Sequence, residues 1–347
     1  MNIQVVNPLS DDRWDDLVAC HPKASVFHGK GWLQALSQTY GYEPRVLTNS
    51  PAGSPLTNGI VMCRVSSWLT GSRFVSLPYS DHCDPLTEAY GDLEGVMSWQ
   101  AAECNGSKSE YIELRPLHPL QHPLGALQAS SSYCFHELDL HPTVEQLFRG
   151  LHKDSIQRSI RRAEKEGLSY EIGNSEELVN EFYKLLMITR RRHRLLPQPR
   201  AWFRNLVQHL GAAVQIRLAR KNTVPIAAIL SLRHRTSVVY KYGCSDARFH
   251  SLGGMPFLLW RMIEESKAAG ADRLDLGRSD IENEGLIRFK DKFGATRSSL
   301  TYYRYVNPRY SGKAHKSWDS ATLRALFCSL PDAAFSGAGS ILYRHMG

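Results

Sequence analysis

Residues 238–246 read VVYKYGCSD and open the stretch that decides the fold. It continues as ARFHSLGGMPF (247–257), LLWRMIEESKAAG (258–270), RLDLGRS (273–279) and EGLIRFKDKF (284–293). The pattern predicts a strand, a glycine turn, an amphipathic helix, a short strand and a basic helix. A strand that passes through Gly253 and Gly254 into a helix presents backbone N–H groups at the helix start, where the helix dipole favours anions. We therefore expect a phosphorylated donor or acceptor to bind at this turn.

The second strand of this stretch ends in polar residues, which is a common place for a reacting centre. Arg278, Ser279 and Asp280 follow Gly277 there. Asp280 can accept a proton from an attacking amine if it lies within hydrogen-bonding distance of that amine. Alternatively, Ser279 or Asp280 caps the following helix, since both residue types are frequent N-caps. Arg278 has no such simple structural role. Arg278 and Asp280 are therefore candidate catalytic residues.

The composition is that of a globular protein with a basic surface. The chain has 347 residues, of which 42% are hydrophobic and 22% charged, and its net charge is +8. This length favours two domains, and the charge favours an acidic partner, such as a phosphate-bearing metabolite, nucleic acid or an anionic membrane surface. The seven cysteines form no CxxC pair and no regular framework. We therefore expect reduced thiols and no metal site.

The motifs of several protein classes are absent from the sequence. It contains no P-loop, no GxGxxG after a strand and no HExxH, so NTPase, Rossmann dehydrogenase and zincin functions lack support. The start MNIQVVNPLSDDRWDD is acidic where a signal peptide is basic and then apolar. No apolar run approaches the ~18 residues of a membrane span. We expect a cytoplasmic protein that can work at the inner face of the membrane.

The predicted elements divide the chain near residue 140. Each half contains helices, a group of antiparallel strands, a further helix and further strands, with Pro/Gly/Ser turns between them. The predicted fold class is therefore α/β (α+β). We predict an N-terminal domain over residues 1–140, a C-terminal domain with the active site over residues 141–306 and a helical tail over residues 307–347. The apolar and basic end of the tail is a candidate membrane-surface contact.

Five motifs along the chain resemble the FemAB-type branch of the GNAT-fold acyltransferases. They are SVFHGKGWLQALSQTYGYEPRVL, FVSLPYSDHCDPL, SIRRAEKEGL, DLGRS and GLIRFKDKFGA. The resemblance spans residues 5–305 and implies two tandem GNAT-like domains, each a mixed, largely antiparallel sheet flanked by helices. Characterised members of the family attach amino acids from aminoacyl-tRNA to the peptide of a cell-wall precursor. Many relatives are instead associated with exopolysaccharide or lipid-envelope clusters.

The resemblance also implies functional residues. The family places a functionally important lysine in an FKxxFG segment, which Lys290 matches. Its ammonium would stabilise charge on the acyl carbonyl or hold the donor phosphate; otherwise it is a solvated lysine on an exposed helix face. In the family, an arginine three residues after a threonine contacts the phosphates of a nucleotide-linked acceptor, and Arg192 holds that position. Arg191 is a second candidate, although a helix C-terminus favours cations for structural reasons alone.

Further candidate binding residues lie on strands and turns. Tyr242 lies near the end of the first strand of the deciding stretch, where we expect it close to Lys290 and Arg278. Tyr79 and Asp81 follow a strand in LPYSDHCDPL, and the alternative interpretation of this segment is an ordinary polar turn. With Gly253 and Gly254, these residues complete the predicted substrate-binding set.

A predicted helix over residues 154–166 has a basic face opposite an apolar stripe. This face suits an RNA acceptor arm or an anionic lipid-linked substrate, but solvated basic faces are common. The basic residues are Arg158, Arg161, Arg162 and Lys165, and the stripe is Ile156, Ile160 and Ala163.

Three functional hypotheses follow from the sequence. The first is an acyl- or aminoacyltransferase that modifies an amine of a phosphorylated or lipid-linked cell-envelope or exopolysaccharide precursor. The second is a tRNA-dependent wall-bridge aminoacyltransferase, and the third is a catalytically inactive GNAT-fold binding module in polysaccharide assembly. No bound cofactor is expected. The donor is acyl-CoA or aminoacyl-tRNA, because the loop from Arg248 to Gly254 only approximates the R/QxxGxG/A loop of CoA-dependent enzymes.

Overall fold

The chain forms two compact units in the computed structural model, which describes residues 2–120, 122, 124–125, 127–311 and 327–347. Unit 1 comprises Met1–Ser132, Leu300–Trp318 and Ile341–Gly347, and unit 2 comprises Tyr133–Ser299 and Asp319–Ser340. The division falls inside two strands, β6 (Gln128–Asp139) and β12 (Thr296–Val306). The domain limits 1–140, 141–306 and 307–347 remain predictions. Residues 312–326 of the predicted tail lie outside the described residues.

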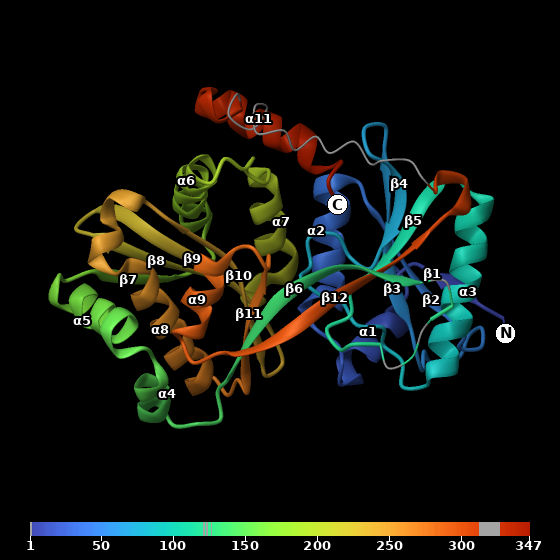
Figure 1. The fold of residues 1–347 in the computed structure, drawn as a ribbon, viewed down its shortest axis with the longest axis horizontal. Coiled ribbons are helices and arrows are strands. Elements are labelled where there is room, and N and C mark those ends of the chain that lie inside the picture. The colour runs from blue at the N-terminus through green and yellow to red at the C-terminus, as the bar shows by residue number, and fades with distance from the viewer. Residues whose placement is uncertain (1, 121, 123, 126, 312–326) are drawn as a thin grey trace. The chain divides into compact units, whose positions relative to one another are not determined.

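Unit 1 has a mixed sheet with strand order β1-β2-β3-β4-β5-β12. Strands β4 and β5 pair parallel, and the other neighbours pair antiparallel. Helix α3 lies on one face of this sheet, and α1 and α2 lie on the other (Figure 1). The elements are β1 (Gln4–Val6), α1 (Asp12–Cys20), η1 (Val26–His28), α2 (Lys30–Tyr40), β2 (Glu43–Thr48), β3 (Ile60–Ser67), β4 (Gly71–Val75), α3 (Tyr90–Gly106), β5 (Ser109–Leu114) and η5 (Pro308–Tyr310).

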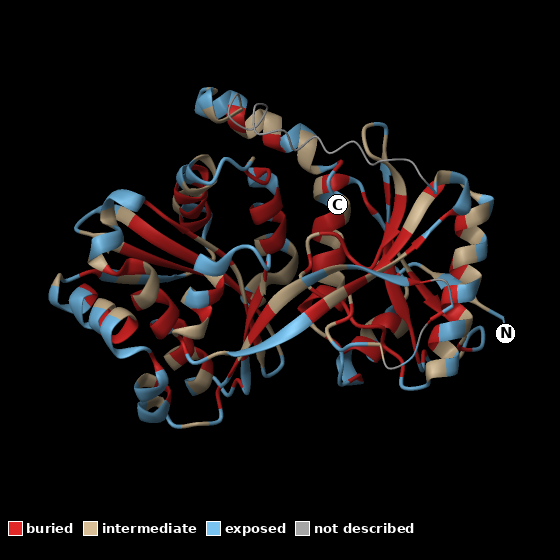
Figure 2. Ribbon diagram, in the orientation of Figure 1, coloured by how far each residue is buried: buried red, intermediate tan, exposed pale blue. Residues whose placement is uncertain are grey.

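The core of unit 1 forms where α3 meets the sheet. Leu93, Val96 and Met97 recur at helical spacing on α3 and pack against Phe74 of β4 and Ile112 of β5. All five side chains are buried. Figure 2 shows that buried residues are frequent along the strands of this unit.

The strands of unit 2 follow one another in the order β6-β11-β10-β9-β8-β7. Strands β10 and β11 pair parallel, and the other neighbours pair antiparallel. Helices α6 and α7 lie on one face and α5 and α8 on the other (Figure 1). The elements are α4 (Val144–Gly150), the π-helical turn η2 (Lys153–Gln157), α5 (Arg158–Lys165), β7 (Ser169–Gly173), α6 (Glu176–Arg192), α7 (Arg200–Leu210), η3 (Gly211–Ala213), β8 (Val214–Lys221), β9 (Val224–His234), β10 (Ser237–Ser245), η4 (Ala247–Leu252), α8 (Gly254–Ala268), β11 (Arg273–Ser279), α9 (Glu284–Asp291) and α11 (Asp332–Tyr343).

The core of unit 2 includes the apolar stripe predicted on residues 154–166. Ile156, Ile160 and Ala163 are buried against α8 residues such as Leu258 and Met262, so this prediction is confirmed. The basic residues of the same segment are exposed. The two strands predicted in the stretch that decides the fold correspond to β10 and β11, which are neighbours in one sheet, and the α/β fold class is confirmed. Among the described residues, no helix has the length and apolar character needed to cross a membrane.

Candidate active site

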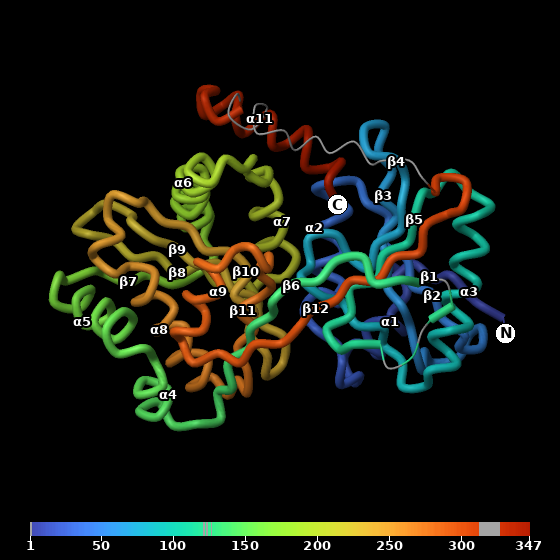
Figure 3. Tube along the Cα trace, viewed as in Figure 1, coloured from blue at the N-terminus to red at the C-terminus, as the bar shows by residue number. Residues whose placement is uncertain are grey.

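The end of β10 in unit 2 borders a cavity of about 350 Å³. Its walls are the end of β10, the start of β9, the first turn of α8, the short helix η4, the end of α6 and Phe289 of α9. These segments are far apart in the sequence, and the tube in Figure 3 shows the path of the chain through them. A cavity of this size accommodates a small molecule or the flexible arm of a larger one.

The cavity lies beside strands that pair over only part of their length. Residues Ser237–Val239 of β10 pair with Arg273–Asp275 of β11, yet β10 continues to Ser245 and β11 to Ser279. The register between β10 and β9 shifts just after this paired segment, which marks a bulge that redirects the strand. The end of β10 is therefore not covered by a β11 partner, and a ligand can approach its backbone.

Polar side chains join the end of α6 to the end of β10. The Thr189 hydroxyl accepts a hydrogen bond from Ser245 N (2.8 Å) and donates one to Ser245 O (3.1 Å). Arg192, one turn further along α6, donates to Ser245 O (3.2 Å) and to His250 Nε2 (3.0 Å). The Ser245 hydroxyl also lies 2.9 Å from His250 Nε2. All four residues line the cavity, so the Arg192 guanidinium is fixed in its wall.

Two histidines beside Arg192 favour their neutral form. Burial lowers the pKa of His250, and the nearby Arg192 lowers it further. Burial, Arg192 and Arg190 act in the same direction on the pKa of His193. Neutral His250 has an acceptor nitrogen for the hydrogen bond from Arg192. The positive charge of this group is therefore carried by Arg192, which suits an anionic ligand.

The predicted glycine turn forms the entrance to α8. Gly253 has a φ of 78°, and a Cβ there would collide with the carbonyl oxygen of Ser159, so the position requires glycine. Gly254 begins the helix and lines the cavity, where an added Cβ would lie 3.1 Å from the Cβ of Ala227. The first turn of α8 thus borders the cavity, where the helix dipole favours negative charge.

Lys290 is buried on the inner side of α9, with 3% of its surface exposed. Its Nζ donates to the carbonyl oxygens of Gly277 (2.8 Å) and Arg278 (3.1 Å) at the end of β11. The alternative interpretation as a solvated surface lysine is therefore wrong. The Arg278 guanidinium carbon lies 4.1 Å from the centre of the Tyr133 ring. Lys290 and Arg278 are thus neighbours, and Phe289, the residue before Lys290, lines the cavity.

The turn between β11 and α9 differs from the prediction. Asp280 is exposed and Ser279 is buried as the last residue of β11, and neither caps the helix. The N-cap is Asn283, whose side chain accepts a hydrogen bond from Leu286 N at 3.1 Å. The capping interpretation of Ser279 and Asp280 is wrong because a turn, closed by a bond from Asn283 N to Asp280 O, precedes the helix.

Arg191 and Tyr242 have structural partners within unit 2. Arg191 donates to the carbonyl oxygen of Leu330 and to the Asp332 carboxylate, both at 2.7 Å, and so anchors the start of α11. The Tyr242 hydroxyl accepts a hydrogen bond from Trp202 Nε1 at 2.9 Å, inside the core. Neither residue belongs to the cavity wall that the described residues form.

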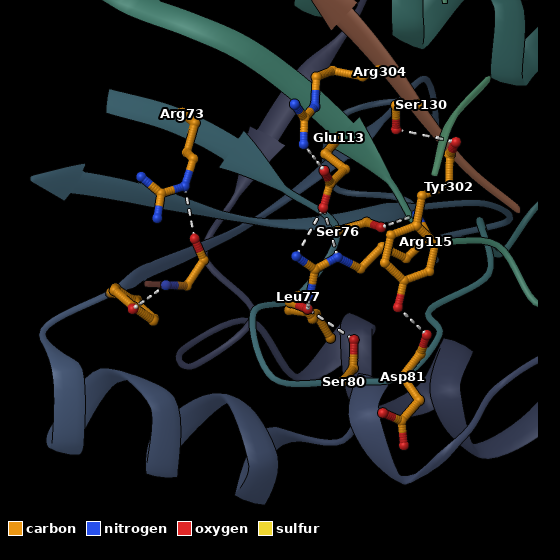
Figure 4. Close-up of polar contacts among 12 residues, drawn as sticks. Arg73, Ser76, Leu77, Ser80, Asp81, Glu113, Arg115, Ser130, Tyr302 and Arg304 are labelled. Carbon is orange, nitrogen blue, oxygen red and sulfur yellow. Dashed lines mark hydrogen bonds and ion pairs between the residues drawn. The ribbon is translucent and has the colours of Figure 1, made fainter. Parts of the chain in front are cut away.

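Tyr79 and Asp81 lie in unit 1, on the loop that follows β4. The Tyr79 hydroxyl donates to the carbonyl oxygen of Tyr343. The Asp81 carbonyl accepts a 2.5 Å hydrogen bond from the Tyr302 hydroxyl (Figure 4). The segment LPYSDHCDPL therefore forms a loop that is held at Tyr79 and at Asp81 by hydrogen bonds of tyrosine hydroxyls.

Unit 1 also contains a buried charge network that the sequence did not indicate. Glu113 of β5, 4% exposed, accepts hydrogen bonds from Arg115 (2.8 Å) and Arg304 (2.6 Å) (Figure 4). Burial raises the pKa of Glu113, but the two guanidinium groups outweigh it and hold the pKa below its usual value. The carboxylate therefore stays ionised and cross-links β5 to β12.

Thr189, Ser245 and His250 were missed as site residues. The sequence carried a partial signal, because Thr189 is the threonine that precedes Arg192 by three residues. Ser245 and His250 lie in the polar link between the predicted strand and the glycine turn, but nothing in that link distinguishes them from solvated loop residues. Among the described residues, no group of three or more His, Cys, Asp or Glu side chains could hold a metal ion.

This arrangement defines a class of protein. A mixed sheet with one parallel pair, a strand that ends beside a glycine-started helix and a cavity at that junction are the features of a GNAT fold. Residues 151–291 match the acetyltransferase (GNAT) domain model, so this part of the chain is a GNAT domain. No match was found among curated proteins.

Solved structures show the same fold over most of the chain. The structure of FemX is similar with a TM-score of 0.68 and 14% identity, covering 89% of this chain and 99% of that one. The DUF2156 domain of a putative lysylphosphatidylglycerol synthetase from Agrobacterium fabrum has a TM-score of 0.56 at 15% identity, covering 92% and 94%. A tandem GNAT protein from the clavulanic acid biosynthesis pathway has a TM-score of 0.55 at 12% identity, covering 88% and 99%. The chain therefore has the tandem GNAT fold, and the predicted resemblance to FemAB-type proteins is confirmed as a likeness of fold.

Proposed function

We propose that the protein is an acyltransferase that moves an acyl or aminoacyl group onto an amine of a cell-envelope or exopolysaccharide precursor. The observation that carries the proposal is the cavity at the end of β10. There, Arg192 and the first turn of α8 offer a cation and a helix N-terminus on the walls of one cavity. A phosphate-bearing donor suits both groups. The likeness to FemX and to a lysylphosphatidylglycerol synthetase domain supports an acceptor from the envelope.

The residues favour direct transfer in a ternary complex. Burial raises the pKa of the Cys244 thiol in the cavity wall, which keeps it protonated and a poor nucleophile. The acceptor amine would attack the acyl carbon, the bond to the donor sulfur or oxygen would break, and the amine proton would pass to solvent or to the leaving group. Asp280 is the candidate first acceptor of that proton. Lys290 would act through the carbonyls of Gly277 and Arg278, by fixing the end of β11 beside the reacting group.

A binding experiment with the purified protein tests the proposal. Acetyl-CoA and longer acyl-CoAs should bind saturably in calorimetry and raise the melting temperature. A ligand at 100 times its Kd adds about 2.7 kcal/mol to the free energy of unfolding. Transfer of a labelled acyl group to envelope amines then tests turnover. If neither acyl-CoA nor aminoacyl-tRNA binds, the protein is an inactive GNAT-fold binding module and the proposal fails.

The exposed basic face of α5 favours a second candidate, a tRNA-dependent aminoacyltransferase. Arg158, Arg161, Arg162 and Lys165 are exposed on this helix and could follow a phosphate backbone. Filter retention of charged and uncharged tRNA separates the candidates, because binding through this face should weaken steeply with salt. In either case we place the protein in the cytoplasm, at the inner face of the membrane where envelope precursors are assembled.

A further inference from the structure

Unit 1 holds the segment 343–347 through the polar atoms of its main chain. The Tyr42 hydroxyl donates to Arg344 O at 3.0 Å, and the Tyr79 hydroxyl donates to Tyr343 O. Tyr343 is the last residue of α11, so these hydroxyls satisfy carbonyl groups that a helix end leaves without an intrahelical partner. These hydroxyls bind main-chain oxygens and so depend on the backbone conformation of the segment.

Arg73 binds the last part of the same segment. This residue of β4 is 3% exposed, and its guanidinium donates to Gly347 O (2.7 Å) and His345 O (2.9 Å). The Thr70 hydroxyl donates to the same His345 carbonyl at 2.6 Å. Figure 4 shows the Arg73 side chain in unit 1, with its hydrogen bond to a backbone oxygen. Release of the segment would remove two acceptors of this guanidinium, which another peptide backbone or water would then have to supply.

The site discriminates at two positions of the segment, since the His345 ring is buried with its Nδ1 3.0 Å from the Ser67 hydroxyl, and Gly347 is confined by Tyr42. A Cβ on Gly347 would collide with the Tyr42 hydroxyl, so this position accepts only glycine without movement of the tyrosine. The Arg344 and Met346 side chains, by contrast, are exposed and free to vary. Burial raises the pKa of Tyr42 to about 12 and that of Tyr79 well above its usual value, so both hydroxyls remain neutral donors.

We propose that Tyr42, Thr70, Arg73 and Tyr79 form a peptide-binding site in unit 1, and that residues 343–347 occupy it as a detachable latch. The ligand class is a peptide that presents four backbone oxygens to these side chains and a glycine to Tyr42. This site is separate from the proposed donor cavity, which is formed by residues of unit 2. The inference therefore does not depend on the proposed function.

Hydrogen–deuterium exchange on the full chain tests the latch. Gly347→Ala should raise the exchange rates of the amides from Tyr343 onward by about tenfold or more, since roughly 1.4 kcal/mol of lost binding gives a factor of ten. Gly337→Ala is the matched control, because it changes a glycine of the same tail where a Cβ meets nothing within 4 Å. If Gly347→Ala exchanges like wild type, the segment is not held in the way proposed.

Binding of a peptide in trans tests the site itself. A labelled peptide with the sequence ILYRHMG (341–347), acetylated and amidated, should bind the Gly347→Ala protein saturably and wild type at least tenfold more weakly. Tyr79→Phe, added to the Gly347→Ala protein, removes one hydroxyl and keeps the ring, so it should weaken peptide binding. This variant is preferred to a change of the buried Arg73, which could prevent folding. A peptide with alanine in place of its glycine should bind more weakly. Failure of the peptide to bind, or equal binding with and without Tyr79→Phe, overturns the proposal.

Discussion

The two units have the same strand order around their parallel pair. In unit 1 the first strand of the pair is hydrogen-bonded to its end, whereas in unit 2 the end of the first strand has no partner in the second. In unit 1, β4 and β5 pair from Ser72 to Val75, the last residue of β4, and Ser76 N continues the ladder to Glu113 O. In unit 2, β10 continues six residues beyond its last pair with β11, at Val239. The cavity of unit 2 lies beside this unpaired end of β10, so the same strand order has different surroundings in the two units.

The segment after the first strand of each parallel pair explains the difference. After β4, the loop 76–89 folds back onto its own sheet, and Cys83 forms a bridge with Arg115 just beyond β5. After β10, the chain passes through η4 and the glycine turn into α8, which leaves the end of β10 accessible. The long loop therefore covers the end of the parallel pair in unit 1, whereas the short connection through Gly253 leaves the end of β10 uncovered in unit 2.

The largest expected effect comes from breaking the buried charge network of unit 1, which links β5 to β12. Glu113→Ala should lower the free energy of unfolding by about 3 kcal/mol, because it leaves Arg115 and Arg304 without their buried carboxylate. Urea unfolding measures this change. Glu284→Ala is the control, since its ion pair with Arg288 is exposed and should contribute less than about 0.5 kcal/mol. Similar losses in both variants would show that the buried network does not stabilise unit 1.

The second effect comes from the turn that opens unit 2. Gly253→Ala places an L-residue in a left-handed conformation, which costs about 1–2 kcal/mol, and also pushes its Cβ into the Ser159 carbonyl. Gly270→Ala has nearly the same φ, 76°, but no atom within 4 Å of the new Cβ. We expect Gly253→Ala to be the more destabilising by at least about 1 kcal/mol, the lower end of overpacking costs. Equal melting temperatures would mean that Ser159 moves freely and that the turn is not held by α5.

The third effect separates two adjacent arginines. Arg192→Ala should weaken binding of a phosphate-bearing donor by roughly 10- to 100-fold, the loss of one charge-assisted hydrogen bond. Arg191→Ala should leave donor affinity unchanged and instead release the start of α11, because Asp332 and Leu330 lose their partner. Calorimetry with acyl-CoA measures the first effect, and limited proteolysis of the tail measures the second. If both variants weaken donor binding equally, Arg192 is not the arginine that binds the donor in the cavity wall.

The sequence predicted the local elements of unit 2 well and the long-range partners poorly. The strands, the helix of α8 and the glycine turn have strong periodicity and turn signals, and each lies within a few residues of its predicted place. Arg191 looked like a ligand-binding cation because five of six residues at the end of α6 are basic. Its true partners lie about 140 residues later in the chain, where no local pattern connects them to α6. Tyr79 is similar, since its partner Tyr343 is distant in sequence.

The smallest effect is a pH dependence of stability that arises at the open end of β10. The pKa of His250 is lower in the folded protein than in the unfolded chain, chiefly because neighbouring groups partly desolvate its ring and then because of Arg192. The unfolded state therefore binds more protons as the pH falls below the ordinary histidine pKa of about 6.5, and stability decreases below that pH.

His250→Gln keeps an acceptor for Arg192 but cannot be protonated. Its loss of stability between pH 7.5 and 5.5 should therefore be smaller than that of wild type, although only slightly, because His250 is exposed and solvent screens its charge. His193 and the other histidines are present in both proteins, so the difference between the two unfolding curves isolates His250. An equal or steeper pH dependence in the variant would show that the contact between Arg192 and His250 does not favour the neutral ring. The positive charge in the cavity wall would then not be carried by Arg192 alone.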